Sequence, residues 1–448
     1  MSPHSPHSHE PILHRLLRLA GPVLVAQVAV VANGVIDTVM AGRISALDLA
    51  AVGVGAAIYI TVFMACMGVL LALTPTVAQL YGAGRRGEIG EEVRQSAWLA
   101  LMLAACGIVV LRNPEPFLLL THLRPEVETK VRAYLEAVSW GIAPGMMFRI
   151  FYGFMTGIGR PRGIMGFNLI GLAVKVPLNA MYMFGLGMGG AGCGASTATV
   201  SWITALLAWS WCARQSHYTE FGVFARFAPP KLGPILALIR LGLPIGFTML
   251  VDVSAFTFMA LFVARLGPTM SAAHQIGSNL TVLTFMIPLS IGHAALVLAG
   301  HALGAGKPAE ARHAGLVGLG VGTAVAFVVS LGLWFGADHL AALYTPNPEV
   351  RAVAAGLIGI IAFYHLADAL QAVIVNVLRG YKKTAVPMVV YAVALWGVGL
   401  GGGYLLGLTD ILGPARGAAG FWIAATASVL IAGVIVLAYF LAVSRRPD

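Results

Sequence analysis

Three aspartates lie inside long apolar segments of the sequence, where a carboxylate has little water to solvate it. Asp37 lies in VAQVAVVANGVIDTVMAGRIS (25–45), and Asp252 and Asp368 occupy comparable segments further along the chain. An unpartnered aspartate at the centre of a bilayer costs about 2.5–3.5 kcal/mol on insertion scales. Such residues usually bind ions, protons or substrates, and the alternative is that each only pairs with a neighbouring helix. All three are therefore candidate functional residues.

Two of these aspartates have a polar residue four positions earlier in the sequence. Asn33 precedes Asp37 by four residues, and Tyr364 precedes Asp368 by four, so each pair shares one face of a helix. Asp252 and Asp368 lie in the same half of the chain, where mutual repulsion and loss of water would both favour binding of a cation or a proton. At Asp37 we expect a cationic substrate or a proton to bind, but not both.

The composition requires a membrane around the helices that carry these residues. Of 448 residues, 58% are hydrophobic and 10% are charged, and the mean hydropathy is +0.85. Soluble proteins are about one quarter charged. The net charge of +10 does not gather on one basic face, so no nucleic-acid partner is expected. Cys66, Cys106, Cys193 and Cys212 all lie in apolar runs and are interpreted as packing residues, not as a disulfide framework.

Apolar runs of about twenty residues predict twelve transmembrane helices. If the amino terminus is cytoplasmic, the segments on that side carry about twice as many Lys and Arg residues as the opposite side, which places both termini in the cytoplasm. The start of the chain shows no cleavable signal pattern. The predicted spans lie near 14–40, 48–74, 93–111, 131–155, 163–185, 191–213, 234–264, 272–298, 313–335, 351–378, 386–407 and 415–443.

The two halves of the sequence repeat each other. RLAGP (18–22) returns as RLGLP (240–244), and GAGRRGE (82–88) returns as GAGKPAE (304–310) at the same offset. Six spans in each half is an even number, so the halves share one orientation. We therefore predict an all-α integral membrane protein with twelve transmembrane helices in two six-helix lobes related by a parallel internal repeat. The predicted parts are a cytoplasmic tail (1–13), an N-lobe (14–213), a cytoplasmic linker (214–233), a C-lobe (234–443) and a second tail (444–448).

Several other chemistries are excluded by missing motifs. GAGK (304–307) is followed by Pro308, where a phosphate-binding loop needs Ser or Thr, so nucleotide binding is not expected and energy should come from an ion gradient. No Asp-rich metal motif of the D-D-x-x-D type occurs, so we predict no enzyme, no cofactor and no metal site. The histidines near the start are interpreted as a solvated tail; they are His4, His7, His9 and His14.

Four motifs resemble those of the multidrug and toxic compound extrusion (MATE) family, and most closely its bacterial NorM-type branch. The resemblance covers the chain from about Leu16 to Leu441. It implies a secondary active antiporter of the bacterial inner membrane that exports amphipathic, often cationic drugs in exchange for Na⁺ or H⁺ by alternating access. We expect its partners to be small-molecule drugs, organic cations and the lipid bilayer, and we expect a monomer. The motifs are LTPTVAQLYGAGRRGE (73–88), AAHQIGSNLTVLTFMIPLSIG (272–292), GHALGAG (300–306) and VLRGYKKT (377–384).

The resemblance also implies roles for the aspartates. Asp37 matches the carboxylate of the family's N-lobe, and Tyr364 and Asp368 match the cation-site pair of its C-lobe. Asp252 stands where this branch usually has Glu. The shorter side chain keeps the charge and leaves both the coordination geometry and the choice between Na⁺ and H⁺ open.

Other polar residues in the spans carry two interpretations each. Gln275 and Asn179 match polar cavity positions of the family, with packing as the alternative. Lys175 departs from the family, whose members tend to carry Asn or another uncharged group there. It either extends its ammonium toward the cytoplasmic interface or faces the N-lobe cavity and pairs with Asp37. Arg149 is expected to extend to the interface or to bridge helices.

One alternative function belongs to the same superfamily. A flippase of lipid-linked saccharides would share the two lobes, but it should line its cleft with several cations to bind pyrophosphate. The candidate residues here are mostly carboxylates, which favours drug export.

Overall fold

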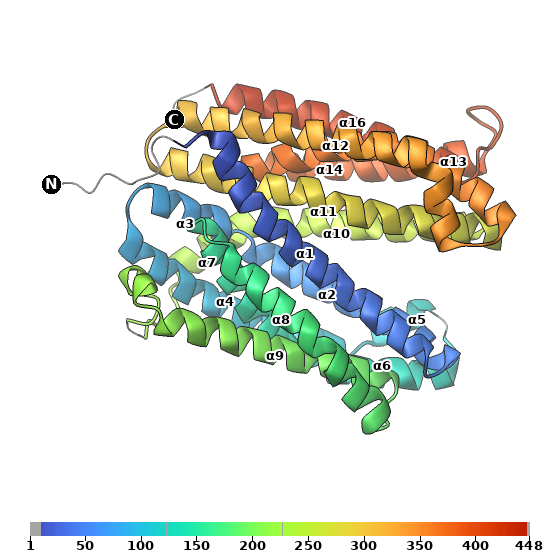
Figure 1. Cartoon of the computed structure of the whole chain (residues 1–448), viewed down its shortest axis with the longest axis horizontal. Helices are drawn as coiled ribbons and strands as arrows, with labels where there is room; N and C mark the ends of the chain where they lie inside the picture. The colour runs from blue at the N-terminus through green and yellow to red at the C-terminus, as the bar shows by residue number, and fades with distance from the viewer. Residues whose placement is uncertain (1–9, 122, 226, 446–448) are drawn as a thin grey trace. The chain divides into compact units, whose positions relative to one another are not determined.

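The computed structural model describes residues 10–121, 123–225 and 227–445, and these residues fold into helices and connecting turns without a β-strand (Figure 1). Within them, eleven helical segments are long and apolar enough to cross a membrane. The predicted all-α, multi-span membrane fold is thereby confirmed. By packing, the chain divides into a unit of residues 25–250 and a unit of residues 1–24 and 251–448.

The unit of residues 25–250 begins within helix α1 and ends within helix α10. A single apolar core that includes Tyr134, Phe151 and Phe154 joins its helices. Aromatic rings pack edge to face in this core, as between Phe154 and Phe221 at 5.4 Å. Its elements are α1 (Ile12–Gly42), α2 (Ala46–Leu70), α3 (Leu73–Gly82), α4 (Arg86–Arg112), α5 (Glu115–Thr121), α6 (Pro125–Ser139), α7 (Ile142–Gly157), α8 (Arg162–Asn179), the π-helical segment η1 (Ala180–Gly185), α9 (Gly190–Arg214) and the 3-10 helix η2 (Ser216–Phe221).

The other unit contains the remaining helices and the start of α1. One of its apolar clusters is centred on Tyr364, Phe421 and Trp422, and a second includes Leu16 of α1 together with Val377 and Phe440. The first turns of α1 therefore pack with helices from the far end of the sequence. The elements are α10 (Leu232–Ala264), α11 (Pro268–Gly304), α12 (Pro308–Tyr344), α13 (Pro348–Gly380), α14 (Ala385–Ala392), the π-helical segment η3 (Val393–Gly401), α15 (Gly402–Leu408) and α16 (Ala418–Val443).

The predicted span near 131–155 is not one continuous helix. Helix α6 ends at Ser139 and α7 begins at Ile142, and these helices have 15 and 16 residues. Pro144 explains the break, because proline lacks the N–H of an α-helical hydrogen bond and its ring clashes with the carbonyl four residues earlier, that of Trp140. Gly141 lies at the break and allows close packing on α9, because a Cβ there would lie 2.8 Å from the backbone of Ala198. The prediction of a single helix was therefore wrong here.

The repeated GAG motif forms the same turn in both places. Gly84 and Gly306 both have φ +71°, a left-handed conformation that glycine adopts without strain. The next residue, Arg85 or Lys307, donates its backbone N–H to the carbonyl five residues earlier, at 3.0 and 2.9 Å. Each turn ends one helix and starts the next, which agrees with the prediction of a turn between spans and not of a phosphate-binding loop.

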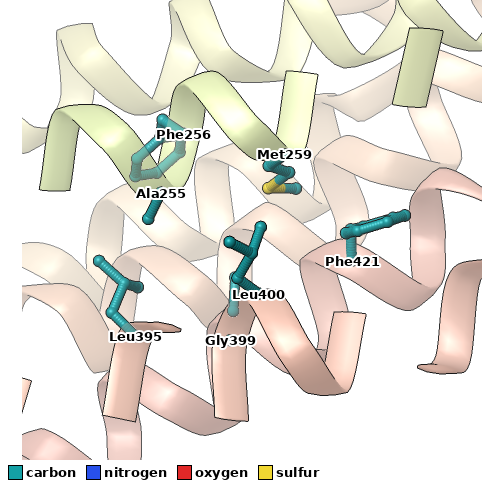
Figure 2. Close-up of a pocket in the computed structure, with 8 residues that line it drawn as sticks. Ala255, Phe256, Met259, Leu395, Gly399, Leu400 and Phe421 are labelled. Atoms are coloured by element: carbon teal, nitrogen blue, oxygen red, sulfur yellow. The ribbon is translucent and has the colours of Figure 1, made fainter. Parts of the chain in front are cut away.

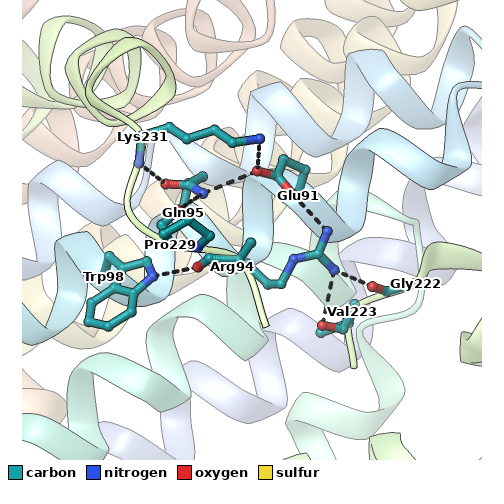
Figure 3. Close-up of polar contacts among 9 residues, drawn as sticks. Glu91, Arg94, Gln95, Trp98, Gly222, Val223, Pro229 and Lys231 are labelled. Atoms are coloured by element: carbon teal, nitrogen blue, oxygen red, sulfur yellow. Dashed lines mark hydrogen bonds and ion pairs between the residues drawn. The ribbon is translucent and has the colours of Figure 1, made fainter. Parts of the chain in front are cut away.

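The segment between α9 and α10 lies against the first turns of α4 (Figure 3). Gln95 donates to the carbonyl of Pro229 at 3.0 Å and accepts the backbone N–H of Lys231 at 2.7 Å. Trp98 donates its indole N–H to the carbonyl of Ala228 at 2.9 Å. Side chains of α4 thus satisfy backbone groups of this segment directly before α10 begins, and they fix the start of α10 to α4.

Candidate functional site

Asp37 lies on the second half of α1 and faces two side chains of α8. Lys175 Nζ lies 3.0 Å from Asp37 Oδ1, and Asn179 Nδ2 donates to the same oxygen at 2.8 Å. Lys175 and Asn179 are four residues apart and share the buried face of α8, whereas Val176 between them is 47% exposed. One carboxylate oxygen therefore accepts from a charged donor and a neutral donor on the same helix.

The position of Lys175 decides between the two interpretations that the sequence left open. Its side chain is 1% exposed. The ammonium also lies 2.6 Å from Thr197 Oγ1 and 3.5 Å from the carbonyl of Cys193, both on α9. Lys175 therefore pairs with Asp37, and the interpretation that it extends to the membrane interface was wrong. Thr197 was not identified from the sequence, although its place in a Ser- and Thr-rich stretch of an apolar helix was a signal.

Two other polar residues of this unit lie apart from the Asp37–Lys175 pair. Asn33 donates to the carbonyl of Ala29 at 3.1 Å within α1, and its amide oxygen has no hydrogen-bond partner among the described residues. Asn33 shares a helix face with Asp37, but the structure gives no hydrogen bond between them. Arg149 lies over the rings of Phe63 and Tyr152 at 5.7 and 5.8 Å and so bridges α7 to α2, in agreement with the interhelical interpretation.

Asp252 lies on α10 and receives a hydrogen bond that the sequence analysis did not identify. The phenolic O–H of Tyr391 on α14 donates to Asp252 Oδ1 at 2.7 Å. Tyr391 is 5% exposed. The spacing that selected Tyr364, four residues before Asp368, could not select Tyr391, which lies 139 positions from Asp252 in the sequence.

Asp368 and Tyr364 lie on α13 near Asp252. Asp368 is 4% exposed, and its carboxylate makes no hydrogen bond to the part of the chain that the structure describes. Its charge interacts with that of Asp252. The Tyr364 ring is 2% exposed and packs edge to face against Trp422, with ring centroids 5.5 Å apart. The structure thus brings together the two carboxylates predicted for this half, with Tyr364 and Tyr391 beside them.

Gln275 is not part of either group. Its side chain is exposed on α11, and it makes no hydrogen bond to the described residues. The neighbouring His274 is buried instead, with its ring centroid 5.7 Å from that of Trp422.

In each unit, a π-helical segment follows the residue that donates a hydrogen bond to the aspartate, Asn179 to Asp37 and Tyr391 to Asp252. Asn179 is the last residue of α8 and is followed directly by η1, and Tyr391 lies near the end of α14, which continues as η3. Wider π-helical turns are rare and occur often at functional sites. Each unit therefore has a carboxylate, Asp37 on α1 or Asp252 on α10, that accepts from a donor in the last two residues before a π-helical segment.

A further carboxylate, Asp48, is buried and has a structural role. It is 3% exposed and accepts from Lys130 Nζ at 2.8 Å, from Ser45 Oγ at 2.6 Å and from the backbone N–H of Gly190 at 2.9 Å. Ser45 also caps α2 by accepting the backbone N–H of Asp48. These contacts join α2, α6 and α9 and leave Asp48 no unsatisfied charge.

The unit of residues 1–24 and 251–448 contains a small pocket (Figure 2). Neither Asp252 nor Asp368 lines it. All its lining residues are apolar, so it offers no ligand for a cation. They belong to α10, η3 and α16 and are Ala255, Phe256, Met259, Leu395, Gly399, Leu400, Phe421 and Ala425.

The described residues include no cluster of three or more His, Cys, Asp or Glu side chains able to hold a metal ion. His4, His7 and His9 of the polar tail lie outside the described residues. All four cysteines are free in this structure. Cys66, Cys193 and Cys212 are buried, as expected of packing residues, whereas Cys106 is exposed, so the packing interpretation was wrong for Cys106.

Comparison with known proteins identifies the family. The family model MatE matches residues 22–181 and 244–405. The chain is 41% identical over 452 residues to a probable multidrug resistance protein NorM of Aromatoleum aromaticum, with 99% of this chain and 97% of the relative covered. It is 37% identical over 439 residues to the multidrug resistance protein MdtK of Yersinia enterocolitica, with 97% and 96% covered.

Solved structures show the same fold. A MATE transporter crystallised in complex with MaL6 matches with a TM-score of 0.89 at 16% identity and covers 97% of each chain. The eukaryotic MATE transporter AtDTX14 matches with a TM-score of 0.86 at 17% identity and covers 96% of this chain and 95% of its own. On the family model and the near full-length relatives, the chain belongs to the MATE family of multi-span membrane transporters.

Proposed function

We propose that this MATE transporter is a secondary active antiporter that exports amphipathic, often cationic compounds across the bacterial inner membrane in exchange for Na⁺ or H⁺. The names of its relatives support drug export, since both NorM and MdtK are described as multidrug resistance proteins. The energy comes from an ion gradient, because the sequence has no nucleotide-binding motif.

The proposed architecture has twelve crossings in two six-helix lobes, 14–213 and 234–443, with a linker at 214–233. Helices α6 and α7 together form the fourth crossing. The identical turns at Gly84 and Gly306 support a parallel repeat. The tails 1–13 and 444–448 are cytoplasmic, as the distribution of Lys and Arg favours, and the transporter is a monomer. Residues 14–24 and 234–250 belong to one lobe by repeat and to the other unit by packing.

The coupling cation binds at Asp368 and Asp252, with Tyr364 and Tyr391 beside them. The observation that carries this assignment is a buried carboxylate, Asp368, that has no hydrogen bond among the described residues and lies near a second carboxylate. Two such groups repel each other in a poorly solvated site, and a proton or a cation removes the repulsion. Because the carboxylates are coupled, their protonation belongs to the pair and not to either residue.

Substrate or a proton binds at Asp37 in the other half. Asn179 and Lys175 hold the carboxylate, and Asn33 on α1 is a further polar residue at this site. Gln275 on α11 lies in the other half and contacts substrate separately from it. Binding at Asp37 is linked to binding of the coupling ion, and such linkage is reciprocal.

The test is drug efflux from proteoliposomes under Na⁺ and H⁺ gradients imposed separately. Asp368→Asn should abolish gradient-driven transport, and Asp37→Asn should strongly reduce export of cationic drugs at equal protein levels. Asp338→Asn is the matched control, since Asp338 lies in the same half but is exposed and paired with Arg351. Transport by Asp368→Asn at the wild-type rate would reject the cation site.

A further inference from the structure

Helices α12, α13 and α16 meet at the ring of Phe440 on α16. A Cβ at Gly315 of α12 would lie 2.8 Å from this ring and 2.9 Å from the side chain of Val377 on α13. The start of α12 and the ends of α13 and α16 therefore pack together at one end of this unit. Asp368 lies about 18 Å before the end of α13, so this region is separate from the proposed cation site.

One polar side chain from each of these helices lies a turn nearer to that end. Arg312 lies three residues before the contact on α12, and Tyr381 and Ser444 each lie four residues after it on the chains of α13 and α16. The rings of Tyr381 and Phe440 pack edge to face, with centroids 5.8 Å apart. The charge of Arg312 acts on the Tyr381 hydroxyl. The three side chains thus surround the same contact.

Each of these side chains has a buried donor without an acceptor. Arg312 Nε, Tyr381 Oη and Ser444 Oγ make no hydrogen bond within the described part of the chain. Buried polar atoms without a partner are costly, and three of them around one contact call for a common acceptor. The acid nearest to Arg312 along α12 is Glu310, and it pairs with Lys307 at 2.8 Å. The missing partner is therefore an anion with several acceptor oxygens.

A ligand reaches this region from outside the protein through Arg312. Arg312 and Tyr381 are partly exposed, and Lys383 and Arg445 in the adjoining sequence are exposed. Among the described residues, the terminal nitrogens of Arg312 have no hydrogen bond, and unlike Nε they are not buried. The guanidinium therefore has one open edge for an anion, and the hydroxyls of Tyr381 and Ser444 lie deeper.

The position of these residues indicates which anion binds. Helices α12, α13 and α16 are long and apolar enough to cross a membrane, so their ends lie at the level of phospholipid headgroups. Further along α12, on the side that carries Arg312, Leu316 and Phe327 are exposed. A phospholipid places its phosphate at the helix ends and its acyl chains along such an apolar face, whereas a free anion makes no use of that face.

We propose that Arg312, Tyr381 and Ser444 bind the phosphate of an anionic phospholipid whose acyl chains lie along the exposed face of α12. The guanidinium binds phosphate oxygens in a bidentate manner, and the two hydroxyls donate to the same oxygens. The lipid then connects the ends of three helices. This site is additional to the proposed antiport and does not depend on which ion or drug is carried.

Native mass spectrometry of the full-length protein measures the affinity for the first bound lipid. Dioleoyl phosphatidylglycerol should bind about tenfold more tightly than dioleoyl phosphatidylcholine, in which choline neutralises the phosphate charge. Dioleoylglycerol has the same chains without the phosphate and should bind as weakly as phosphatidylcholine. Inorganic phosphate has no chains, and a large excess of it should leave phosphatidylglycerol bound.

Three variants test the donors individually. Arg312→Gln should weaken the binding of phosphatidylglycerol about tenfold and remove the preference over phosphatidylcholine. Tyr381→Phe and Ser444→Ala should each weaken it about threefold. Tyr381→Phe keeps the ring that packs on Phe440, so its effect does not depend on a loss of packing. Lys307→Gln is the matched control, because it removes an exposed cation from the start of the same helix and should leave the affinity unchanged.

Two results with these proteins would overturn the proposal. Wild-type affinity in Arg312→Gln would mean that water satisfies the three donors. An equal loss in Lys307→Gln would mean that the lipid responds only to the general positive charge of this end.

Two competing anions are tested in the same way. Displacement of phosphatidylglycerol by inorganic phosphate would identify the ligand as a free anion and reject the lipid. Asp448 is the acid among residues 446–448, which lie outside the described residues. Asp448→Asn should bind phosphatidylglycerol as the wild type does. Tighter binding by Asp448→Asn would mean that the acid of the chain itself occupies the site, and the lipid assignment would be wrong.

Discussion

The carboxylates in the two halves of this transporter are held in opposite ways. Asp37 is paired with a buried ammonium and an amide, whereas Asp252 receives one neutral hydroxyl and Asp368 receives no hydrogen bond among the described residues. Both arrangements place an acid on the first helix of a half and a donor before a π-helical segment. The same framework therefore yields a neutral site in one half and an acidic site in the other, and charge balance separates their chemistry.

The largest expected effect on stability comes from removing Lys175, which leaves Asp37 without its ion-pair partner. Lys175→Met should lower the free energy of unfolding by about 3 kcal/mol, because breaking a buried ion pair leaves an uncompensated charge. Chemical denaturation in detergent micelles would measure the change. Adding Asp37→Asn should restore most of the lost stability. If the double variant were as unstable as the single one, packing and not charge would explain the loss.

Removal of a charge from the acidic site should change the free energy of unfolding in the opposite direction. At a pH at which Asp368 is ionised, Asp368→Asn should raise the free energy of unfolding by about 1–2 kcal/mol, because it removes a buried charge that has no hydrogen bond among the described residues. The same denaturation experiment would show the change, and Asp338→Asn, at an exposed pair, should shift stability by less than about 1 kcal/mol. A destabilised Asp368→Asn protein would mean that the carboxylate has a stabilising partner.

Tyr391→Phe should have a smaller effect. It removes the only described hydrogen bond to Asp252, worth about 1 kcal/mol, and keeps the ring that fills the core. The cation dependence of transport should shift several-fold in concentration while drug affinity stays constant. Tyr404→Phe is the matched control, since the Tyr404 ring packs on Phe262 in the same half. Equal cation dependence in both variants would remove Tyr391 from the site.

The smallest effect is expected from Asn179→Ala. Asp37 keeps its ion pair with Lys175 when the amide is lost, so the cost should be about 0.5–1 kcal/mol. Parallel denaturation of Asn179→Ala and Lys175→Met would compare the two donors directly. A loss larger in Asn179→Ala than in Lys175→Met would contradict the dominance of charge in this half.

The sequence predicted the helical membrane fold and the family because apolar length, the internal repeat and the motifs are local properties of the chain. It also identified the three aspartates inside apolar spans, since a charge in an apolar run is visible without a structure. The split of the span at 131–155 was missed, although Pro144 was a local signal for it. The sequence did not determine contacts between distant residues. Lys175 with Asp37 and Tyr391 with Asp252 are pairs more than one hundred positions apart. Such contacts depend on how helices rotate when they pack, which the helical period alone leaves undetermined.

The packing of the first turns of α1 has a consequence for the order in which the protein is made. Leu16 is fully buried in a cluster with Ala314 and Val377, residues synthesised about 300 positions or more later. At roughly 5–20 residues per second, a ribosome needs on the order of 15–60 s to cover that distance. During this interval the start of α1 has lipid in place of its protein neighbours, so the first segment to enter the membrane is among the last to reach its native contacts.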